Sequence, residues 1–489
     1  MNSRQRFYFC KYPIASYMKR PVITALFCAL GLGLFAQDSD AARFMYDKDR
    51  LSKEFHAGRR DALRRLMPDS SVAVFFANPE RNRANDVDYQ YHQDPNFYYL
   101  TGLEEPNAML FVFKEKQHVD TLYTNEIIFV QGRDQKEEAW TGRRLGTKGV
   151  RDLYGLNTVL LNTTFADMNI DFAKYKRVLF SPLITDLRDD PGDRGDLFSM
   201  IRYFRNRTEK NKNNENYYVA QYMAMLRQIK QPEEMVLLRK AIDMSCIGHI
   251  ELIKALEDGM NEYEAQAVIE YVFKKYGAEY CGYPSIVGGG ENSCILHYIS
   301  NRRPLTGKDM LVVDAGAEYH GYTADITRTL PTDGKYSDQE KAIYNIVLEA
   351  QEAGIKACRK GNEFRGPHKE ALKVIQARLK ELGIIKKDEE CLQYFFHGTS
   401  HYLGLDVHDP GLYGKLEPGN VITVEPGIYI PEGSPCDPKW WNIGIRIEDD
   451  VLITDGDPDV LSKAVPKTVE SIEKLMEEKS YLNQPKSDN

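Results

Sequence analysis

The first two hundred residues alternate short apolar runs with polar segments. Residues 71–76, 108–113 and 126–130 are mostly aliphatic or aromatic and are separated by polar stretches. Apolar runs of this length, rich in β-branched and aromatic residues, are typical of strands. Because helical patches lie between them, residues 40–204 are predicted to form a mixed α/β domain.

A polar stretch separates this region from the rest of the chain. Residues 205–216 (RNRTEKNKNNEN) contain no apolar side chain. That composition is typical of a linker or an exposed loop. We therefore expect residues 205–231 to be a linker and interdomain segment.

The second half of the chain, residues 232–475, begins with helical periodicity. Pro232 suits a first helical turn, and apolar residues then recur every three to four positions, which predicts a helix. A second helix is expected to continue to Tyr276. The period then changes to two over residues 310–317 and 322–330, so these segments are expected to form two strands of a hairpin.

Helices and strands follow one another in groups in this half. Ser337 and Glu340 have the spacing of a capping box and mark the start of a helix, and a further helix is expected to end at Gly383. Strands return at 421–430 and 444–453. Grouped rather than alternating elements indicate an α+β domain, followed by a polar tail over residues 476–489.

The first 36 residues have the pattern of a cleaved secretory signal. Residues 22–36 are apolar and follow Lys19 and Arg20. This segment is shorter than the roughly 20 residues that cross a bilayer. We expect cleavage near Ala36, a periplasmic or secreted protein, and no stable membrane anchor afterwards. The start codon (Met1 or Met18) stays open, and a buried core helix is the alternative.

Composition and charge exclude several classes of protein. The chain has 64 Lys plus Arg against 72 Asp plus Glu, a net charge of −8. Residues 1–36 hold five basic and no acidic residues, so the exported chain would carry −13. An acidic chain without a basic stripe does not suit a nucleic-acid partner. The cysteines form no CxxC pair, which argues against a thiolate zinc site and a disulfide scaffold.

Four carboxylates of the second half lie in predicted strands. Asp314 follows an apolar run, Asp325 lies in the partner strand of the hairpin, and Glu425 and Glu448 lie in the later strands. A hairpin can place two acids on one face, where they destabilise each other unless a proton or a cation lies between them. Each acid alone can be a solvent-facing strand residue, but the four together indicate a metal site.

Histidines add to this signal. His397, His401 and His408 fall within twelve residues, and His297 follows a run of three glycines. Neutral imidazole is a common metal ligand and a common proton-transfer group. Each histidine alone can be a surface or half-buried side chain, but beside the four acids they become candidates for a metal centre.

The strings that carry these residues are similar to the signature blocks of one enzyme family. DAGAEYHGYTADITRTLP, HGTSHYLGLDVHD, TVEPGIYI and IGIRIEDD resemble, in order and spacing, the blocks of the Xaa-Pro aminopeptidases (aminopeptidase P), which are pita-bread metallopeptidases. Residues 83–108 and 138–146 resemble the N-terminal domain of the same enzymes. The resemblance implies an α+β pita-bread catalytic domain over 232–475, preceded by a smaller mixed α/β aminopeptidase P N-terminal domain.

The resemblance also implies a metal centre and an activity. An oxygen-rich set with one imidazole suits Mn²⁺ better than structural zinc, so two divalent ions, Mn²⁺, are the expected cofactors. The implied substrates are peptides with an Xaa-Pro N-terminus, and Glu425 is expected to move the proton during hydrolysis. The five residues that match the metal ligands are Asp314, Asp325, His401, Glu425 and Glu448.

Four further residues match positions that contact the substrate. His297 and His408 match histidines that hold the scissile peptide and stabilise the tetrahedral intermediate. His397 and Arg446 match residues at the proline end, and Arg446 can also support a ligand carboxylate.

The resemblance further implies a homo-oligomer, a dimer or a tetramer. In oligomeric relatives a loop of a neighbouring N-terminal domain narrows the entrance to the site, and Trp140 is the candidate for that role here. A tryptophan buried within its own domain is the alternative.

Two other functions compete with this one. Prolidase, a dipeptidase, has the same five ligands. The N-terminal block (residues 83–108) and the motif HGTSHYLGLDVHD favour the aminopeptidase. A non-catalytic peptide-binding protein on the same scaffold would have lost ligands, whereas this chain has all five.

Overall fold

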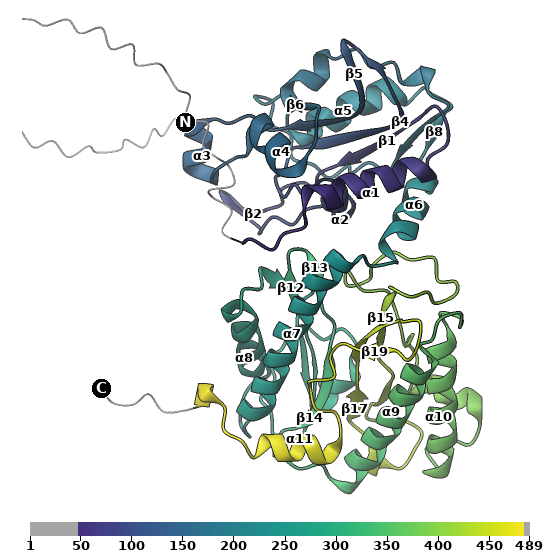
Figure 1. The fold of residues 1–489 in the computed structure, drawn as a ribbon. Helices are drawn as coiled ribbons and strands as arrows, with labels where there is room; N and C mark the ends of the chain where they lie inside the picture. Colours follow the sequence, from purple (N-terminus) through teal and green to yellow (C-terminus); the bar gives the residue numbers. More distant parts are fainter. Residues whose placement is uncertain (1–46, 484–489) are drawn as a thin grey trace, which may run out of the picture.

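The computed structural model describes residues 47–483, which form two domains, one above the other in Figure 1, joined by helix α6 (Tyr217–Arg227). The expected signal sequence and the last residues of the expected tail lie outside the described residues. No helix between residues 47 and 483 has the length and apolar character needed to cross a membrane.

The N-terminal domain is built on one mixed sheet of six strands in the order β6-β5-β4-β1-β7-β8. The central strand β1 (Ser71–Phe76) is antiparallel to β4 (Met109–Val119) and parallel to β7 (Arg177–Phe180). Because successive side chains of a strand point to opposite faces, Val72 enters one hydrophobic cluster and Ala73 the other. The three apolar runs therefore form strands as predicted.

Helices cover both faces of this sheet. Ser52 caps helix α1 (Lys53–Leu66): its side-chain oxygen accepts a hydrogen bond from the amide of Phe55 at 3.1 Å, a standard N-cap. The other helices and strands of the domain are α2 (Pro95–Thr101), α3 (Gln135–Thr141), α4 (Gly146–Tyr154), α5 (Leu197–Thr208), β2 (Asn82–Ala84), β3 (Val87–Asp88), β5 (Leu122–Val130), β6 (Val159–Leu161) and β8 (Asn214–Glu215).

The segment 205–231 is not the exposed linker that its polar composition predicted. Helix α5 continues to Thr208, and β8 pairs with β7 at the edge of the sheet. The side chain of Asn213 donates to the carbonyl oxygens of Phe172 and Tyr175. Polar side chains here satisfy backbone groups of the domain, so a polar composition accompanies an ordered structure.

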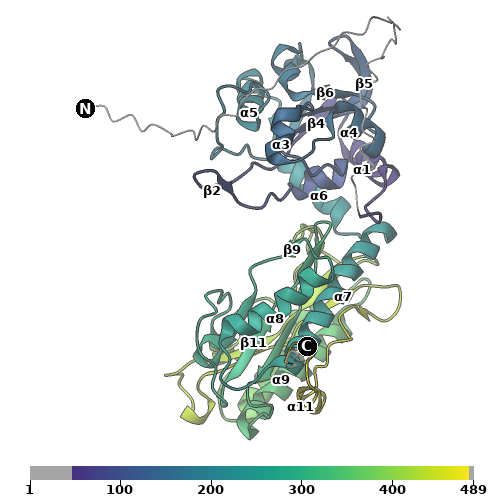
Figure 2. The ribbon, with the colours of Figure 1, turned by 90° about the vertical axis from the view of Figure 1, so that its left-hand side faces the viewer.

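The C-terminal domain contains most of the longer helices, and Figure 2 shows α7 and α8 packed side by side. Helix α7 begins at Pro232, and α9 begins at the capping box of Ser337 and Glu340, both as predicted. The helices are α7 (Pro232–Ala255), α8 (Glu262–Lys275), α9 (Asp338–Ala357), α10 (Gly366–Glu381) and α11 (Val469–Met476).

The strands of this domain are shorter than predicted, because each long strand is interrupted. The expected hairpin exists, but β11 pairs with β14 in one sheet while β12 pairs with β13 in another. The expected strand at 421–430 is β15 and β16, and that at 444–453 is β17 and β18. The strands are β9 (Tyr280–Cys281), β10 (Ile286–Gly289), β11 (Met310–Asp314), β12 (Ala317–Tyr319), β13 (Tyr322–Thr323), β14 (Thr327–Pro331), β15 (Val421–Val424), β16 (Gly427–Ile430), β17 (Ile443–Arg446), β18 (Asp449–Leu452) and β19 (Asp459–Val460).

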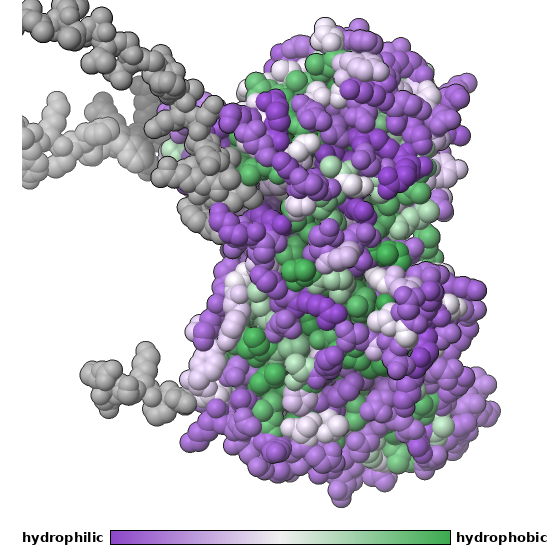
Figure 3. Space-filling model, viewed as in Figure 1, coloured by the Kyte–Doolittle hydropathy of each residue, from purple (hydrophilic) through white to green (hydrophobic). Residues whose placement is uncertain are grey.

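The two domains share one hydrophobic cluster, which includes Tyr98 of α2 and Tyr322 of β13. Figure 3 shows hydrophobic side chains near the level where the domains meet, on a face that is otherwise largely hydrophilic. The described part of the expected tail is also ordered. Ser480 donates to Glu251, and the side chain of Asn483 donates to the carbonyl oxygen of Ala255, so this part is held against α7.

Candidate active site

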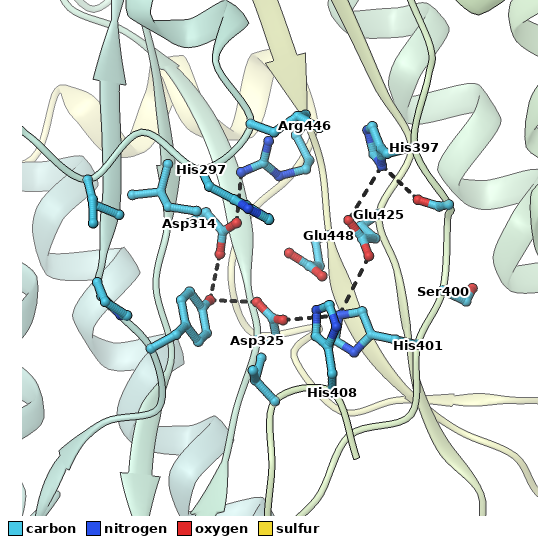
Figure 4. Close-up of a pocket in the computed structure, with 17 residues that line it drawn as sticks. His297, Asp314, Asp325, His397, Ser400, His401, His408, Glu425, Arg446 and Glu448 are labelled. Carbon is cyan, nitrogen blue, oxygen red and sulfur yellow. Dashed lines mark hydrogen bonds and ion pairs between the residues drawn. The ribbon is translucent and has the colours of Figure 1, made fainter. Parts of the chain in front are cut away.

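The four acids predicted to bind metal lie where strands end or break. Asp314 ends β11 and Asp325 lies between β13 and β14, while Glu425 follows β15 and Glu448 precedes β18. Outside a regular ladder the side chains no longer have to alternate between two faces, so acids from different sheets face one space (Figure 4). All four line a single cavity of about 570 Å³.

His401 enters the cavity from the loop before β15. Its Nδ1 lies 3.0 Å from the carbonyl oxygen of Tyr402, and a carbonyl only accepts, so Nδ1 carries the proton. Nε2 therefore faces the acids, 3.3 Å from Asp325 Oδ2 and 3.6 Å from Glu425 Oε1. This is the usual arrangement of a metal-binding histidine, with one nitrogen held by the backbone and the other free to ligate.

Burial and the charges of neighbouring acids both disfavour the ionised form of these carboxylates. Burial and the charge of Asp314 raise the pKa of Asp325. Burial also raises the pKa of Glu448 well above its usual range and the pKa of Glu425 to about 7. Burial alone would lower the pKa of His401, but its hydrogen bond to Asp325 and the charge of Glu425 raise it to about 9. The cluster thus favours positive charge in its centre.

The donor set fits divalent cations. Asp325, His401 and Glu448 offer ligand atoms that all lie within 4.8 Å of one another. The hydroxyl of Tyr283 lies 2.5 Å from both Asp314 Oδ1 and Asp325 Oδ1. The hydroxyl has one proton and can donate it to only one of these oxygens at a time. The contact with the second oxygen is therefore favourable only if another proton or a cation is bound there.

Asp314 and Glu425 flank this close group of three rather than belonging to it. Asp314 Oδ2 accepts a hydrogen bond from Arg446 Nη2 at 2.7 Å, and Glu425 Oε1 accepts one from the hydroxyl of Thr423 at 3.4 Å. Both acids still line the same cavity as the group. The five predicted ligands are therefore brought together around one cavity, and three of them have ligand atoms within 4.8 Å of one another.

Arg446 contacts the carboxylate of Asp314, a predicted ligand, directly. It donates to Asp314, and its Nη1 donates to the hydroxyl of Tyr429 at 3.0 Å. That hydroxyl lies 3.0 Å from His397 Nε2, which accepts because His397 Nδ1 faces the carbonyl oxygen of Gly398 at 2.7 Å. Arg446 and His397 are thus connected through Tyr429 beside the acids.

The other two predicted histidines line the cavity with few contacts of their own. The ring of His408 lies 4.1 Å from that of His401, centroid to centroid. Desolvation and the neighbouring His401 lower the pKa of His408 to about 4, so it is a neutral imidazole at pH 7. His297 lines the same cavity (Figure 4). Both rings are therefore available to a ligand.

Sequence reasoning missed three hydroxyl side chains at the site, two of which contact the acids, while the third contacts Arg446 and His397. These are Tyr283, Tyr429 and Thr327, whose hydroxyl donates to Glu448 Oε2 at 2.6 Å. Thr327 stands two residues after Asp325 in DITRT. That spacing within a strand is the one signal that places a hydroxyl near the acids, whereas only tertiary contacts reveal the two tyrosines.

The chain is similar to known proteins over most of its length. Residues 236–455 match the model of metallopeptidase family M24, and residues 56–180 match that of the aminopeptidase P N-terminal domain. The Xaa-Pro aminopeptidases of Escherichia coli (strain K12) and Haemophilus influenzae are 35% and 36% identical to the chain, each over 87% of this chain and 98% of the relative. The chain belongs to the Xaa-Pro aminopeptidase family. The structure of Pseudomonas aeruginosa aminopeptidase PepP is similar as well, with a TM-score of 0.77 and 34% identity over 88% of this chain and 99% of that one.

Membership in the Xaa-Pro aminopeptidase family confirms the fold class and the resemblance of the motifs. The protein is a metallo-aminopeptidase, a hydrolase with a divalent metal site, and its catalytic pita-bread domain follows an aminopeptidase P N-terminal domain. The relatives favour the aminopeptidase over both the dipeptidase and the non-catalytic binding protein.

In this Xaa-Pro aminopeptidase a buried ion cluster holds the loop that carries His408. The next residue, Asp409, accepts hydrogen bonds from Arg227 Nη2 at 2.5 Å and from Lys230 Nζ at 2.7 Å. Arg227 also donates to Asn96 of the N-terminal domain at 2.7 Å. The side chains of the two cations and of Asp409 are almost fully buried, so the cluster connects the loop of His408 to the N-terminal domain.

Asp409→Ala should lower the stability of the protein by about 3–5 kcal/mol, because it leaves two buried cations without their acid. A thermal unfolding scan measures this as a lower melting temperature. Asp455→Ala is the matched control, since Asp455 pairs with Lys360 in solvent and exposed pairs contribute about 0–1 kcal/mol. Equal melting temperatures for the two variants would contradict a structural role for the cluster.

Proposed function

We propose that this aminopeptidase removes the N-terminal residue from peptides with proline in second position, and that its cofactors are two Mn²⁺ ions. The observation that carries the proposal is the donor set, four carboxylates and one imidazole in a single cavity. Hard oxygen donors suit Mn²⁺, whereas structural zinc sites are richer in sulfur. The sequence similarity to Xaa-Pro aminopeptidases supports the proline specificity.

Asp314, Asp325, His401, Glu425 and Glu448 would hold the ions. When bound, divalent cations in such sites lower the pKa of a shared water and polarise the substrate carbonyl. Glu425 would accept and return the proton, since its Oε1 and Oε2 lie 3.6 Å from His401 and 3.7 Å from His397.

The substrate would lie between two groups of side chains. His297 and His408 would donate hydrogen bonds to the scissile peptide, where negative charge develops on the carbonyl oxygen. His397, held by Tyr429 and Arg446, would lie beside proline. The apolar lining, which includes Leu296, suits a proline ring.

The test is metal analysis combined with activity on a tripeptide and a dipeptide. After loading with Mn²⁺, Co²⁺ or Zn²⁺, the protein should bind two ions, and Mn²⁺ should support the highest rate on an Xaa-Pro-Xaa tripeptide. A chelator should remove that activity and Mn²⁺ should restore it. One bound ion at saturation would contradict the two-metal centre, and cleavage of Xaa-Pro dipeptides alone would indicate a prolidase.

We also propose a homo-oligomer in which Trp140 narrows a neighbour's entrance. Trp140 is 89% exposed on α3, so the alternative of a buried tryptophan is wrong. Trp140→Ala should weaken the rejection of substrates with extra N-terminal residues, measured as kcat/KM for peptides of increasing length. Tyr123→Ala removes another exposed aromatic of the N-terminal domain and should have no effect. An unchanged length preference in Trp140→Ala would rule out this role.

Export is proposed from the N-terminal signal pattern alone. The mature protein should begin near Gln37, which N-terminal sequencing of material from the natural source checks directly. A mature chain that retains residues 22–36 would contradict cleavage.

A further inference from the structure

A short backbone segment, residues 315–317, links the surroundings of two of the acids. Asp314 is the last residue of β11, and this segment leads from it into β12. The amide of Ala315 donates to the carbonyl oxygen of Ile326 at 3.2 Å, and Ile326 directly follows Asp325. One hydrogen bond thus joins the residue after each acid, so the position of the segment affects how far apart the two acids lie.

The segment 315–317 has no polar side chain with which to hold its own position. Its sequence is Ala-Gly-Ala. A Cβ at Gly316 would lie 1.8 Å from the carbonyl oxygen of Ala324, so only glycine fits where the backbone passes this close to the returning chain. The amide of Gly282 donates to the carbonyl oxygen of Gly316 at 3.0 Å. Polar side chains that fix the segment can therefore come only from other elements.

Helix α7, which lies beside β12 and β13 (Figure 1), supplies two such side chains. His249 Nε2 lies 3.1 Å from the carbonyl oxygen of Ala315, and a carbonyl only accepts, so the imidazole donates. The hydroxyl of Ser245 accepts from the amide of Ala317 at 2.8 Å and donates to the carbonyl oxygen of Ala241. Because they are four residues apart in a helix, the two side chains lie on the same face.

Both side chains are buried in the core of the catalytic domain. Ser245 is fully buried and His249 is 1% exposed, and burial lowers the pKa of His249 to about 4, so its ring is neutral at pH 7. Buried neighbours on α7, such as Ile242 and Leu252, are apolar. A polar group in such surroundings costs free energy unless it is hydrogen-bonded. The bonds to the segment are therefore what these two side chains contribute at positions that apolar residues could otherwise fill.

The two acids need such support because they lie close together. Asp314 Oδ1 and Asp325 Oδ1 each lie 2.5 Å from the hydroxyl of Tyr283, and like charges this close repel each other when both are ionised. The hydrogen bonds from α7 act on the backbone and do not depend on the charge of either acid. They can therefore hold the segment before any cation binds.

We propose that His249 and Ser245 are positioning residues, which hold the segment 315–317 so that the two acids keep the spacing of a metal site. Neither side chain lines the active-site cavity, so both act through the backbone. This role rests on the proposed function, because it takes Asp314 and Asp325 to be metal ligands. Its measurable consequence is the affinity of the metal-free protein for Mn²⁺.

Two substitutions of His249 separate its hydrogen bond from its packing. Leucine fills much of the same space but has no donor, whereas the side-chain amide of glutamine can donate in place of Nε2. Isothermal titration calorimetry of the metal-free proteins should show about 10–100-fold weaker Mn²⁺ binding for His249→Leu, the usual effect of losing a group that orients ligands. His249→Gln should stay close to the wild type.

Ser245→Ala is a second variant, which removes only a hydroxyl group. It should also weaken Mn²⁺ binding, because the amide of Ala317 loses its acceptor. Cys246→Ala is the matched control, since Cys246 is 3% exposed on the same helix but its Sγ faces the carbonyl oxygen of Ser462. This control should lower the melting temperature, as a core truncation does, and leave the affinity for Mn²⁺ unchanged.

The outcomes separate this role from the proposed function. Wild-type affinity for Mn²⁺ in His249→Leu and Ser245→Ala would overturn the positioning role and leave the proposed function intact. Equal losses in His249→Leu and His249→Gln, or an equal loss in Cys246→Ala, would show that packing matters and not the donated hydrogen bond, and would overturn it too. If His249→Leu does not fold, Ser245→Ala decides in the same way. Absence of Mn²⁺ binding by the wild type would overturn the proposed metal centre and this role with it.

Discussion

Glu425→Gln should nearly abolish turnover, with kcat lower by about two to four orders of magnitude, the usual contribution of a positioned general base. Glutamine has the same shape but cannot accept the proton. The amide of Glu425 donates to the carbonyl oxygen of Thr399 at 2.9 Å, and this bond anchors the backbone in both proteins. The loss should therefore come from the side chain and not from a displaced strand.

Metal content measured on the same samples separates two roles of Glu425. Retention of both ions with a low kcat would indicate proton transfer, and loss of an ion would indicate that ligation dominates. Glu432→Gln is the control, because Glu432 is an exposed acid in the turn after β16 and should leave the rate unchanged. A wild-type rate in Glu425→Gln would contradict the assignment of the base.

His408→Ala should lower kcat about 10²–10³-fold while both metal ions stay bound. One donor aimed at the developing oxyanion is typically worth about 3–4 kcal/mol, or two to three decades of rate. The imidazole of His408 lies beside that of His401 and is neutral at pH 7. It can therefore donate from a ring nitrogen without adding a positive charge to the site.

Steady-state kinetics and metal analysis check this prediction together. A fall in kcat with little change in KM would show that His408 acts mainly in the transition state. His118→Ala removes an exposed histidine of the N-terminal sheet and should have no effect. Loss of metal from His408→Ala would make this residue a ligand and contradict its role as a donor.

Local sequence patterns correctly predicted much of the secondary structure. Strand β1 coincides with the apolar run 71–76, and helix α9 starts at the capping box of Ser337 and Glu340. These features depend on neighbours within a few residues, so the sequence carries them directly. The prediction that the polar stretch 205–216 is an exposed linker is wrong, because composition does not show whether side-chain amides form hydrogen bonds with water or with the backbone.

The chemistry of the site could also be predicted, but not its geometry. Three acids, Asp325, Glu425 and Glu448, were expected inside continuous strands and instead lie at their breaks. A strand breaks when distant segments pair with its two parts, as when β11 and β12 enter different sheets. Periodicity along the chain contains no information about those distant partners.

The sequence by itself determined the donor set of this protein, the order of its motifs and the family to which it belongs. Only the tertiary structure decided which atoms meet. Arg446 bonds to Asp314 from a strand more than a hundred residues away, and Tyr283 lies between two acids. His249 of α7 likewise contacts the carbonyl oxygen of Ala315, which lies far away in the sequence. Such contacts depend on how helices and sheets pack, which local sequence does not specify.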